Sequence, residues 1–349
     1  NTVKYQIIID DTSNFSSPIV DYTSALDTQG SRSFTVGQSA GSGTYSTGTN
    51  GQVLADGSYY WQVKAIDNSA AASSYSVANS GNVAFRVDST LPSAPGTPTT
   101  ASPSSTATPT WTWNASSDSG SGLASPEYTV RWSQNSNFDS GVTISTTNNA
   151  SYVHTSELAQ GNWYFQVKAT DTVGLSTNFS TSGQVFIDTL PPTTPGKPTT
   201  TSPTNNIKPT FSWTPAIDPG VGLDNVPYNL QWSKSENFSN SVFSSAVNTN
   251  TFTHSSSLTE GTWYCRVSAS DLLGHNSNYS LIGNVIIDTT APIISLIGNS
   301  SQSLLIGDNY FEMGATATDA VNGDISSWIV VSGQVDTTKI GEYQLTYSG

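Results

Sequence analysis

The sequence repeats itself at a spacing of one hundred residues, and this repeat constrains the fold more than any other feature. The segments "FRVDSTLP", "VFIDTLPP" and "VIIDTTAP" carry acids at equivalent positions, Asp88, Asp188 and Asp288. Repetition at a domain-sized period indicates tandem copies of one folding unit. The same offset of one hundred links further identical pairs, namely Trp113 and Trp213, Asp118 and Asp218, Tyr128 and Tyr228, Phe138 and Phe238, Gly161 and Gly261, and Asp171 and Asp271.

Apolar and polar residues alternate inside each copy. In "GNWYFQVKATD", which begins at Gly161, the apolar residues Trp163, Phe165, Val167 and Ala169 occupy every second position. This alternation is typical of an antiparallel strand with one buried face. About seven short runs of this kind, separated by Gly, Pro and Asn clusters, fall within each copy of roughly 100 residues. The sequence therefore predicts an all-β fold made of tandem two-sheet β-sandwiches.

The repeated residues resemble a known family. They are similar to bacterial fibronectin type III-like domains, a branch of the immunoglobulin-like sandwiches, and the resemblance covers three copies between residues 5 and 288. It implies the fold and no particular ligand. The residues that carry it in the second copy are Trp113, Tyr128, Leu158, Gly161, Trp163, Val167, Ala169, Asp171, Gly174 and Ser176.

From about Thr289 the pattern changes. The motifs "GATATD" and "NGDIS" resemble a second family of bacterial immunoglobulin-like domains, which is common as repeats in large surface proteins. We therefore expect four domains. They are a fibronectin type III-like sandwich at residues 1–90 that lacks its first strands, two complete ones at 91–190 and 191–289, and a bacterial Ig-like domain at 290–349 that lacks its last strand.

Both ends of the sequence correspond to positions inside a domain. Tyr5 aligns with Tyr128, so the two strands that precede Tyr128 have no equivalent in the first copy. Either the sequence is a window of a longer chain, which we favour, or neighbouring molecules supply the strands. The first copy also carries a Gly- and Ser-rich insertion between Phe34 and Leu54. It is interpreted as a solvated loop with some added strand, or as a contact loop anchored by Tyr45.

The charge balance disfavours several classes of partner. Charged residues make up 10% of the chain, with 11 Lys and Arg against 25 Asp and Glu, and the net charge is -14. Binding to nucleic acid or to an anionic membrane surface needs clustered basic residues, so we expect neither partner. The longest apolar runs have the length of a strand, so no membrane insertion is expected in this segment. Cys265 aligns with Phe165 and Trp61, which predicts a buried apolar role.

Eight aspartates are the candidate site residues. In a sandwich of this kind, the loops after the second and sixth strands lie at the end where the chain enters. We therefore expect three groups at successive junctions, and Ca²⁺ is the cofactor that such carboxylates favour. The alternative is that each Asp only caps a turn. The predicted groups are Asp88, Asp118 and Asp171 at the first junction, Asp188, Asp218 and Asp271 at the second, and Asp288 and Asp319 at the third.

Catalytic patterns are weak in this sequence. His154 and His254 are equivalent strand residues and His275 lies in a loop, which does not predict a catalytic triad or a zinc site. No pair of acids occupies an evident cleft, so glycoside hydrolysis has no support. We therefore expect that the chain is not an enzyme.

These observations favour a non-enzymatic, extracellular structural stalk of a bacterial or archaeal cell-surface protein, fibre or adhesin. Its expected partners are neighbouring domains or subunits of the same surface assembly, and a host or environmental glycan or protein is a further candidate. The first alternative is a set of accessory carbohydrate-associated modules of a secreted polysaccharide-degrading enzyme. The second alternative is a self-assembling filament or surface-layer subunit.

Overall fold

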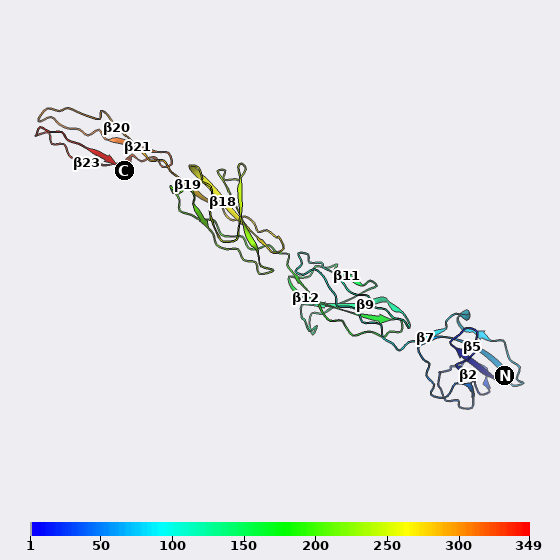
Figure 1. Ribbon diagram of the computed structural model, residues 1–349. Coiled ribbons are helices and arrows are strands. Elements are labelled where there is room, and N and C mark those ends of the chain that lie inside the picture. The colour runs from blue at the N-terminus through cyan, green and yellow to red at the C-terminus, as the bar shows by residue number, and fades with distance from the viewer. Residues whose placement is uncertain (1) are drawn as a thin grey trace. The chain divides into compact units, whose positions relative to one another are not determined.

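The computed structural model describes residues 2–349 and confirms the all-β, tandem-sandwich fold class (Figure 1). The chain divides into two compact units, residues 1–189 and 190–349. Apart from the strands, the described part of the chain contains two short 3-10 helices, η1 (Ala78–Gly81) and η2 (Ser326–Trp328). Neither of them has the length or the apolar character that a membrane crossing requires.

The second sandwich, in the first unit, is built from two antiparallel sheets. The larger sheet has the order β10-β9-β12-β13 and the smaller one pairs β11 with β8, while Thr99 adds a bridge to Thr112 at the edge. Strand β9 pairs with β12 and strand β8 with β11, although neither pair is consecutive in the chain, and such crossovers between two sheets are the Greek-key connections of an immunoglobulin-like sandwich. The strands are β8 (Thr110–Thr112), β9 (Leu123–Ser133), β10 (Thr143–Thr147), β11 (Ser151–Val153), β12 (Gly161–Asp171) and β13 (Gly183–Ile187).

The core of the second sandwich lies between these sheets. Phe165, Val167 and Ala169 on β12 are fully buried, as the alternation predicts. Trp111 from β8 stacks on Phe165 with ring centroids 4.9 Å apart, and this contact joins the smaller sheet to the larger one. The hydroxyl of buried Tyr128 accepts the backbone N–H of Ser116 at 2.9 Å, so its polar end is satisfied inside the core.

The third sandwich, in the second unit, repeats this arrangement. Its sheets are β16-β15-β18-β19 and β14-β17. Leu230 faces Val267 across β15 and β18, in the register that pairs Val130 with Val167 in the second sandwich. The strands are β14 (Thr210–Ser212), β15 (Leu223–Ser233), β16 (Phe243–Val247), β17 (Thr251–Thr253), β18 (Gly261–Asp271) and β19 (Gly283–Ile287).

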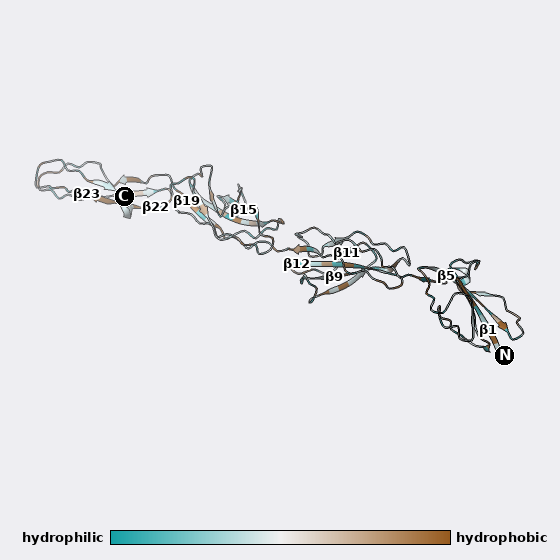
Figure 2. Ribbon diagram, turned by 60° about the horizontal axis from the view of Figure 1, so that its bottom comes forward, coloured by the Kyte–Doolittle hydropathy of each residue, from teal (hydrophilic) through white to brown (hydrophobic). Residues whose placement is uncertain are grey.

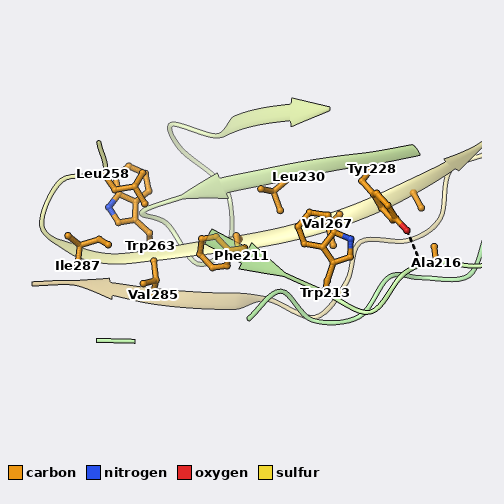
Figure 3. Close-up of a cluster of buried hydrophobic side chains, with 12 residues drawn as sticks. Phe211, Trp213, Ala216, Tyr228, Leu230, Leu258, Trp263, Val267, Val285 and Ile287 are labelled. Atoms are coloured by element: carbon orange, nitrogen blue, oxygen red, sulfur yellow. Dashed lines mark hydrogen bonds between the residues drawn. The ribbon is translucent and has the colours of Figure 1, made fainter. Parts of the chain in front are cut away.

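Figure 3 shows the buried cluster of the third sandwich, with Phe211, Trp213 and Val267 between the strands. The Tyr228 hydroxyl accepts the N–H of Ala216 at 3.2 Å, which is the dashed bond in the figure. Cys265 is buried, as predicted, and its burial raises the pKa of the thiol to about 12. The thiol is therefore protonated at neutral pH and acts as a small apolar side chain.

One cross-strand pair is reversed between the two sandwiches. Arg131 on β9 donates to Gln166 on β12, with Nη2 to Oε1 at 2.6 Å, whereas Arg266 on β18 donates to Gln231 on β15 at 2.9 Å. Both guanidinium groups lie over an aromatic ring, for example Phe179 for Arg131 at 4.0 Å. The position of the cation on the sheet is thus kept although the strand that supplies it changes.

In the first sandwich the strands form one extensive sheet, and the segment around Phe34 and Tyr45 covers part of its apolar face. Ile7 pairs with Val63 and Tyr5 with Ala65, which confirms the alignment of Tyr5 with Tyr128. The order is β4-β2-β1-β5-β6, with β3 on β1 and β7 on β5. The strands are β1 (Thr2–Asp10), β2 (Val20–Thr23), β3 (Asp27–Thr28), β4 (Thr44–Thr47), β5 (Gly57–Asp67), β6 (Ser76–Val77) and β7 (Phe85–Val87).

The insertion between Phe34 and Leu54 packs on the sheet of its own domain. The Tyr45 ring lies 4.9 Å from that of Tyr22, and its hydroxyl donates to the Gln38 carbonyl at 2.9 Å. The Phe34 ring also packs against Tyr22, with ring centroids 5.0 Å apart. The expectation of added strand is met by β4, and the partly buried Tyr45 packs against the core of this domain.

The C-terminal region of the second unit forms two small sheets. One has the order β20-β21-β22 and the other pairs β23 with β24. Within it Ala317 and Ile325 are the buried apolar side chains, and larger ones such as Phe311 and Ile340 are exposed. In Figure 2 the hydrophobic brown colour is concentrated along strands such as β1 and β9, and the connections are paler. The strands are β20 (Ile293–Leu296), β21 (Ala315–Asp319), β22 (Gly323–Asp324), β23 (Val330–Ser332) and β24 (Thr346–Ser348).

The buried histidines predict how stability depends on pH. Burial lowers the pKa of His154 and of His254 from 6.5 to about 4. Because the unfolded chain then binds protons more readily, each histidine favours folding above pH 6.5, and this contribution falls away as the pH drops toward 4. We expect each to reduce the free energy of unfolding by roughly 2 kcal/mol between pH 7 and pH 5.

Urea unfolding of the wild type and of His154→Phe and His254→Phe, at pH 7 and pH 5, measures this effect. Each variant is expected to lose less stability than the wild type over this interval, because phenylalanine does not titrate. An equal loss in all three chains would contradict the interpretation.

Candidate functional site

The structure brings together the first predicted group of acids, Asp88, Asp118 and Asp171. Asp88 directly follows β7, Asp118 lies in the connection between β8 and β9, and Asp171 is the last residue of β12. One carboxylate oxygen from each lies within 4.8 Å of those from the other two. Three segments that are distant in sequence therefore place three carboxylates at one point within the first unit.

Asp171 is the most deeply buried of the three, with 1% of its surface exposed. Its Oδ1 accepts the N–H groups of Val173 at 3.0 Å and Leu175 at 2.8 Å, which closes the turn after β12. Its Oδ2 is buried and has no hydrogen-bond partner within residues 2–349. A buried carboxylate oxygen without a donor is costly, because it has left water and gained nothing in exchange.

Asp118 caps the turn that precedes β9. Its Oδ2 accepts the N–H of Gly122 at 2.6 Å. Gly122 has a φ of +82°, in the left-handed region where glycine carries no steric penalty. The turn thus fixes one oxygen of Asp118, and the carboxylate contributes one oxygen to the group defined above.

Asp88 is held by donors from two directions. Its Oδ1 accepts the hydroxyl of Thr90 at 2.7 Å, and its Oδ2 accepts the N–H of Ser121 at 2.7 Å. Hydrogen bonds from Ser121 and Thr90 lower the pKa of Asp88 to about 2, so this carboxylate is ionised at neutral pH. A Cβ added to Gly120 would lie 2.5 Å from the Asp88 carboxylate, so the close approach requires glycine there.

Within residues 2–349, no ion pair balances the negative charge of this cluster. The ion pairs found in the described residues involve Asp27, Asp271 and Asp336, and none includes the three clustered acids. Their hydrogen-bond donors are uncharged backbone N–H and hydroxyl groups. Turn capping, the alternative prediction, is therefore observed for each acid, yet it leaves oxygen atoms that face one another.

The remaining predicted acids belong to several parts of the chain. Asp188 is buried near the end of the first unit, whereas Asp218 and Asp271 belong to the second unit, so the second predicted group stays a prediction. Asp218 repeats the turn of Asp118, with its Oδ2 accepting the N–H of Gly222 at 2.6 Å. Its Oδ1 is buried and lacks a partner in the part of the chain that the structure describes.

Asp271 differs from its equivalent Asp171 in one partner. Its Oδ1 accepts the N–H groups of Leu273 and His275, as in the second sandwich, but its Oδ2 is paired with Nδ1 of His275 at 2.7 Å. Although burial opposes it, hydrogen bonding to His275 lowers the pKa of Asp271. Sequence reasoning missed this pair, although an alignment of the copies could have found it, because His275 stands where Leu175 does.

The third predicted pair is not part of a larger acidic group. Asp319 accepts the N–H groups of Val321 and Asn322, each at 2.8 Å, and these bonds lower its pKa. Asp288 has one buried oxygen without a partner among the described residues. Within residues 2–349, neither acid joins a cluster of three or more metal-ligating side chains.

Comparison with known proteins finds a family match for the C-terminal part of the chain. Residues 294–349 match the model of the bacterial surface protein Ig-like domain, which confirms the second resemblance seen in the sequence. The crystal structure of chicken CNTN1 FN1-FN3 domains aligns with a TM-score of 0.34 and 14% sequence identity, covering 81% of this chain and 89% of that one. No curated protein matches the chain.

The pair of Asp271 and His275 generates a stability prediction. His275→Leu restores the residue of the second sandwich and leaves the buried Asp271 Oδ2 without a donor. We expect the free energy of unfolding of the third sandwich to fall by about 1–3 kcal/mol at pH 7, the typical cost of an unsatisfied buried acceptor.

Differential scanning calorimetry in EDTA would measure this change in the full chain. Leu272→Ala is the matched control, because Leu272 lies in the same turn with its side chain exposed. A His275→Leu variant as stable as this control would contradict the inferred role of the pair.

Proposed function

We propose that the chain is a non-catalytic structural part of an extracellular bacterial or archaeal cell-surface protein, in which tandem sandwiches act as a spacer within a stalk or adhesin. The observation that carries the proposal is that the repeat preserves structural features of the sandwich. Between the second and third sandwiches it keeps the register, the core and the capped turns, as in the equivalent pairs Val130–Val167 and Leu230–Val267. Repetition of these structural features adds one more folded domain, and so more length, with each copy.

The description of the matching family supports a location at the cell surface. The matched family, at residues 294–349, is described as a domain of bacterial surface proteins. The low content of charged residues, 10%, also suits such a protein, and the buried Cys265 has no exposed thiol for redox chemistry.

Immunolabelling of intact source cells tests this proposal. Antibodies against residues 91–190 are expected to label unpermeabilised cells, and protease added outside is expected to remove the label while a cytosolic marker survives. Labelling that requires permeabilisation would overturn the surface location.

Two further measurements separate the structural role from its alternatives. The purified chain is expected to stay monomeric by electron microscopy and light scattering, and to bind no polysaccharide on a glycan array. Ordered polymers would instead identify a filament or surface-layer subunit. Specific glycan binding would favour an accessory module of a polysaccharide-degrading enzyme.

A further inference from the structure

We propose that Asp88, Asp118 and Asp171 form a binding site for Ca²⁺. Their carboxylate oxygens lie within 4.8 Å of one another. Two ligands on opposite sides of a calcium ion, each at about 2.3–2.6 Å, are separated by about 4.6–5.2 Å, so this cluster has the dimensions of a calcium shell. The inference is independent of where the chain is located in or outside the cell.

The second observation behind the proposal is the buried oxygen of Asp171. Its Oδ2 has no donor in the described structure although the residue is 1% exposed, while its Oδ1 is fixed by two N–H groups of the turn. The side chain cannot rotate away without breaking these bonds. Buried polar atoms in native proteins nearly always have a partner, and a cation beside the neighbouring carboxylates supplies one.

The chemistry of the site favours calcium over other ions. The ligands are hard carboxylate oxygens, and no His or Cys belongs to the cluster in the part of the chain described, as a structural zinc site would require. Mg²⁺ demands a tighter octahedron at about 2.0–2.1 Å, which suits a spread of carboxylates less well. Three carboxylates leave room for water molecules, as in calcium sites of extracellular modules with dissociation constants of about 10⁻⁴–10⁻³ M.

A bound ion would tie together two parts of the first unit. Asp88 belongs to the segment that follows β7, whereas Asp118 and Asp171 belong to turns of the second sandwich. The hydrogen bond from Ser121 N–H to Asp88 already joins these parts. Calcium would add charge-based links at the same point and would hold the segment after β7 against the turns before β9 and after β12.

The first and third sandwiches provide internal comparisons. Asp67 occupies the position of Asp171 and caps the same turn, accepting the N–H of Ala71 at 2.8 Å, but it is exposed and outside the cluster. In the third sandwich, His275 satisfies the oxygen that is free in Asp171. Leu175→His would place the same internal partner beside Asp171 and would compete with the ion.

Calorimetric titration of the full chain with CaCl₂, after removal of metals with EDTA, tests the proposal. The wild type is expected to bind Ca²⁺, and Asp171→Asn and Asp118→Asn are each expected to lower the number of ions bound by one or to weaken that site at least tenfold. Asp67→Asn is the matched control and is expected to bind like the wild type. Calcium is also expected to raise the melting temperature of the wild type more than that of Asp171→Asn.

Gly120→Ala tests the geometry without removing a charge. Its added Cβ would displace the Asp88 carboxylate, so weaker binding is expected with all three acids present. The proposal would be overturned if the wild type bound no calcium at a CaCl₂ concentration 10-fold above a dissociation constant of about 10⁻³ M. It would equally be overturned if Asp171→Asn, Asp118→Asn and Asp67→Asn, each shown to be folded by circular dichroism, bound calcium as the wild type does.

Discussion

Packing of aromatic side chains between two sheets is the interaction on which the rest of this structure depends. In the second sandwich, Trp111 from the smaller sheet stacks on Phe165 of the larger one, and Trp113 meets Tyr128 edge-on at 5.4 Å. These contacts set the spacing of the sheets and so position the turns at their ends. Since Asp118 and Asp171 lie in those turns, the acidic cluster is a consequence of the core packing.

The three copies satisfy this constraint in different ways. In the third sandwich the stacked pair is replaced by the smaller Phe211 and Cys265, and Trp263 becomes buried to 8% exposure and joins the core. In the first copy no strand equivalent to β8 lies among the described residues, and the insertion with Phe34 covers part of the sheet instead. A sandwich sheet with one apolar face must be covered, and the chain meets this need locally where the usual strand does not provide it.

Sequence reasoning predicted the features that follow from period and topology. The alternation in β12 was enough to place the buried face, and the loop positions of a sandwich were enough to expect the convergence of Asp88 with Asp118 and Asp171. Features that depend on one contact could not be predicted. The packing of Tyr45 on its own sheet, and the reversal of the Arg131–Gln166 pair as Gln231–Arg266, require knowledge of which side chains meet in space.

Turn capping and ion binding were treated as alternatives at the level of sequence, and the structure explains why they are compatible. A carboxylate has two oxygens, and in Asp171 one of them closes the turn while the other is buried without a partner among the described residues. The cap fixes the direction of the second oxygen, which lowers the entropy lost when an ion binds. A repeated Asp can therefore be structural in every copy and still have a second oxygen available for a further role. Asp67, Asp171 and Asp271 show three outcomes of the same capped turn, in which the second oxygen is exposed, unpartnered or paired with histidine.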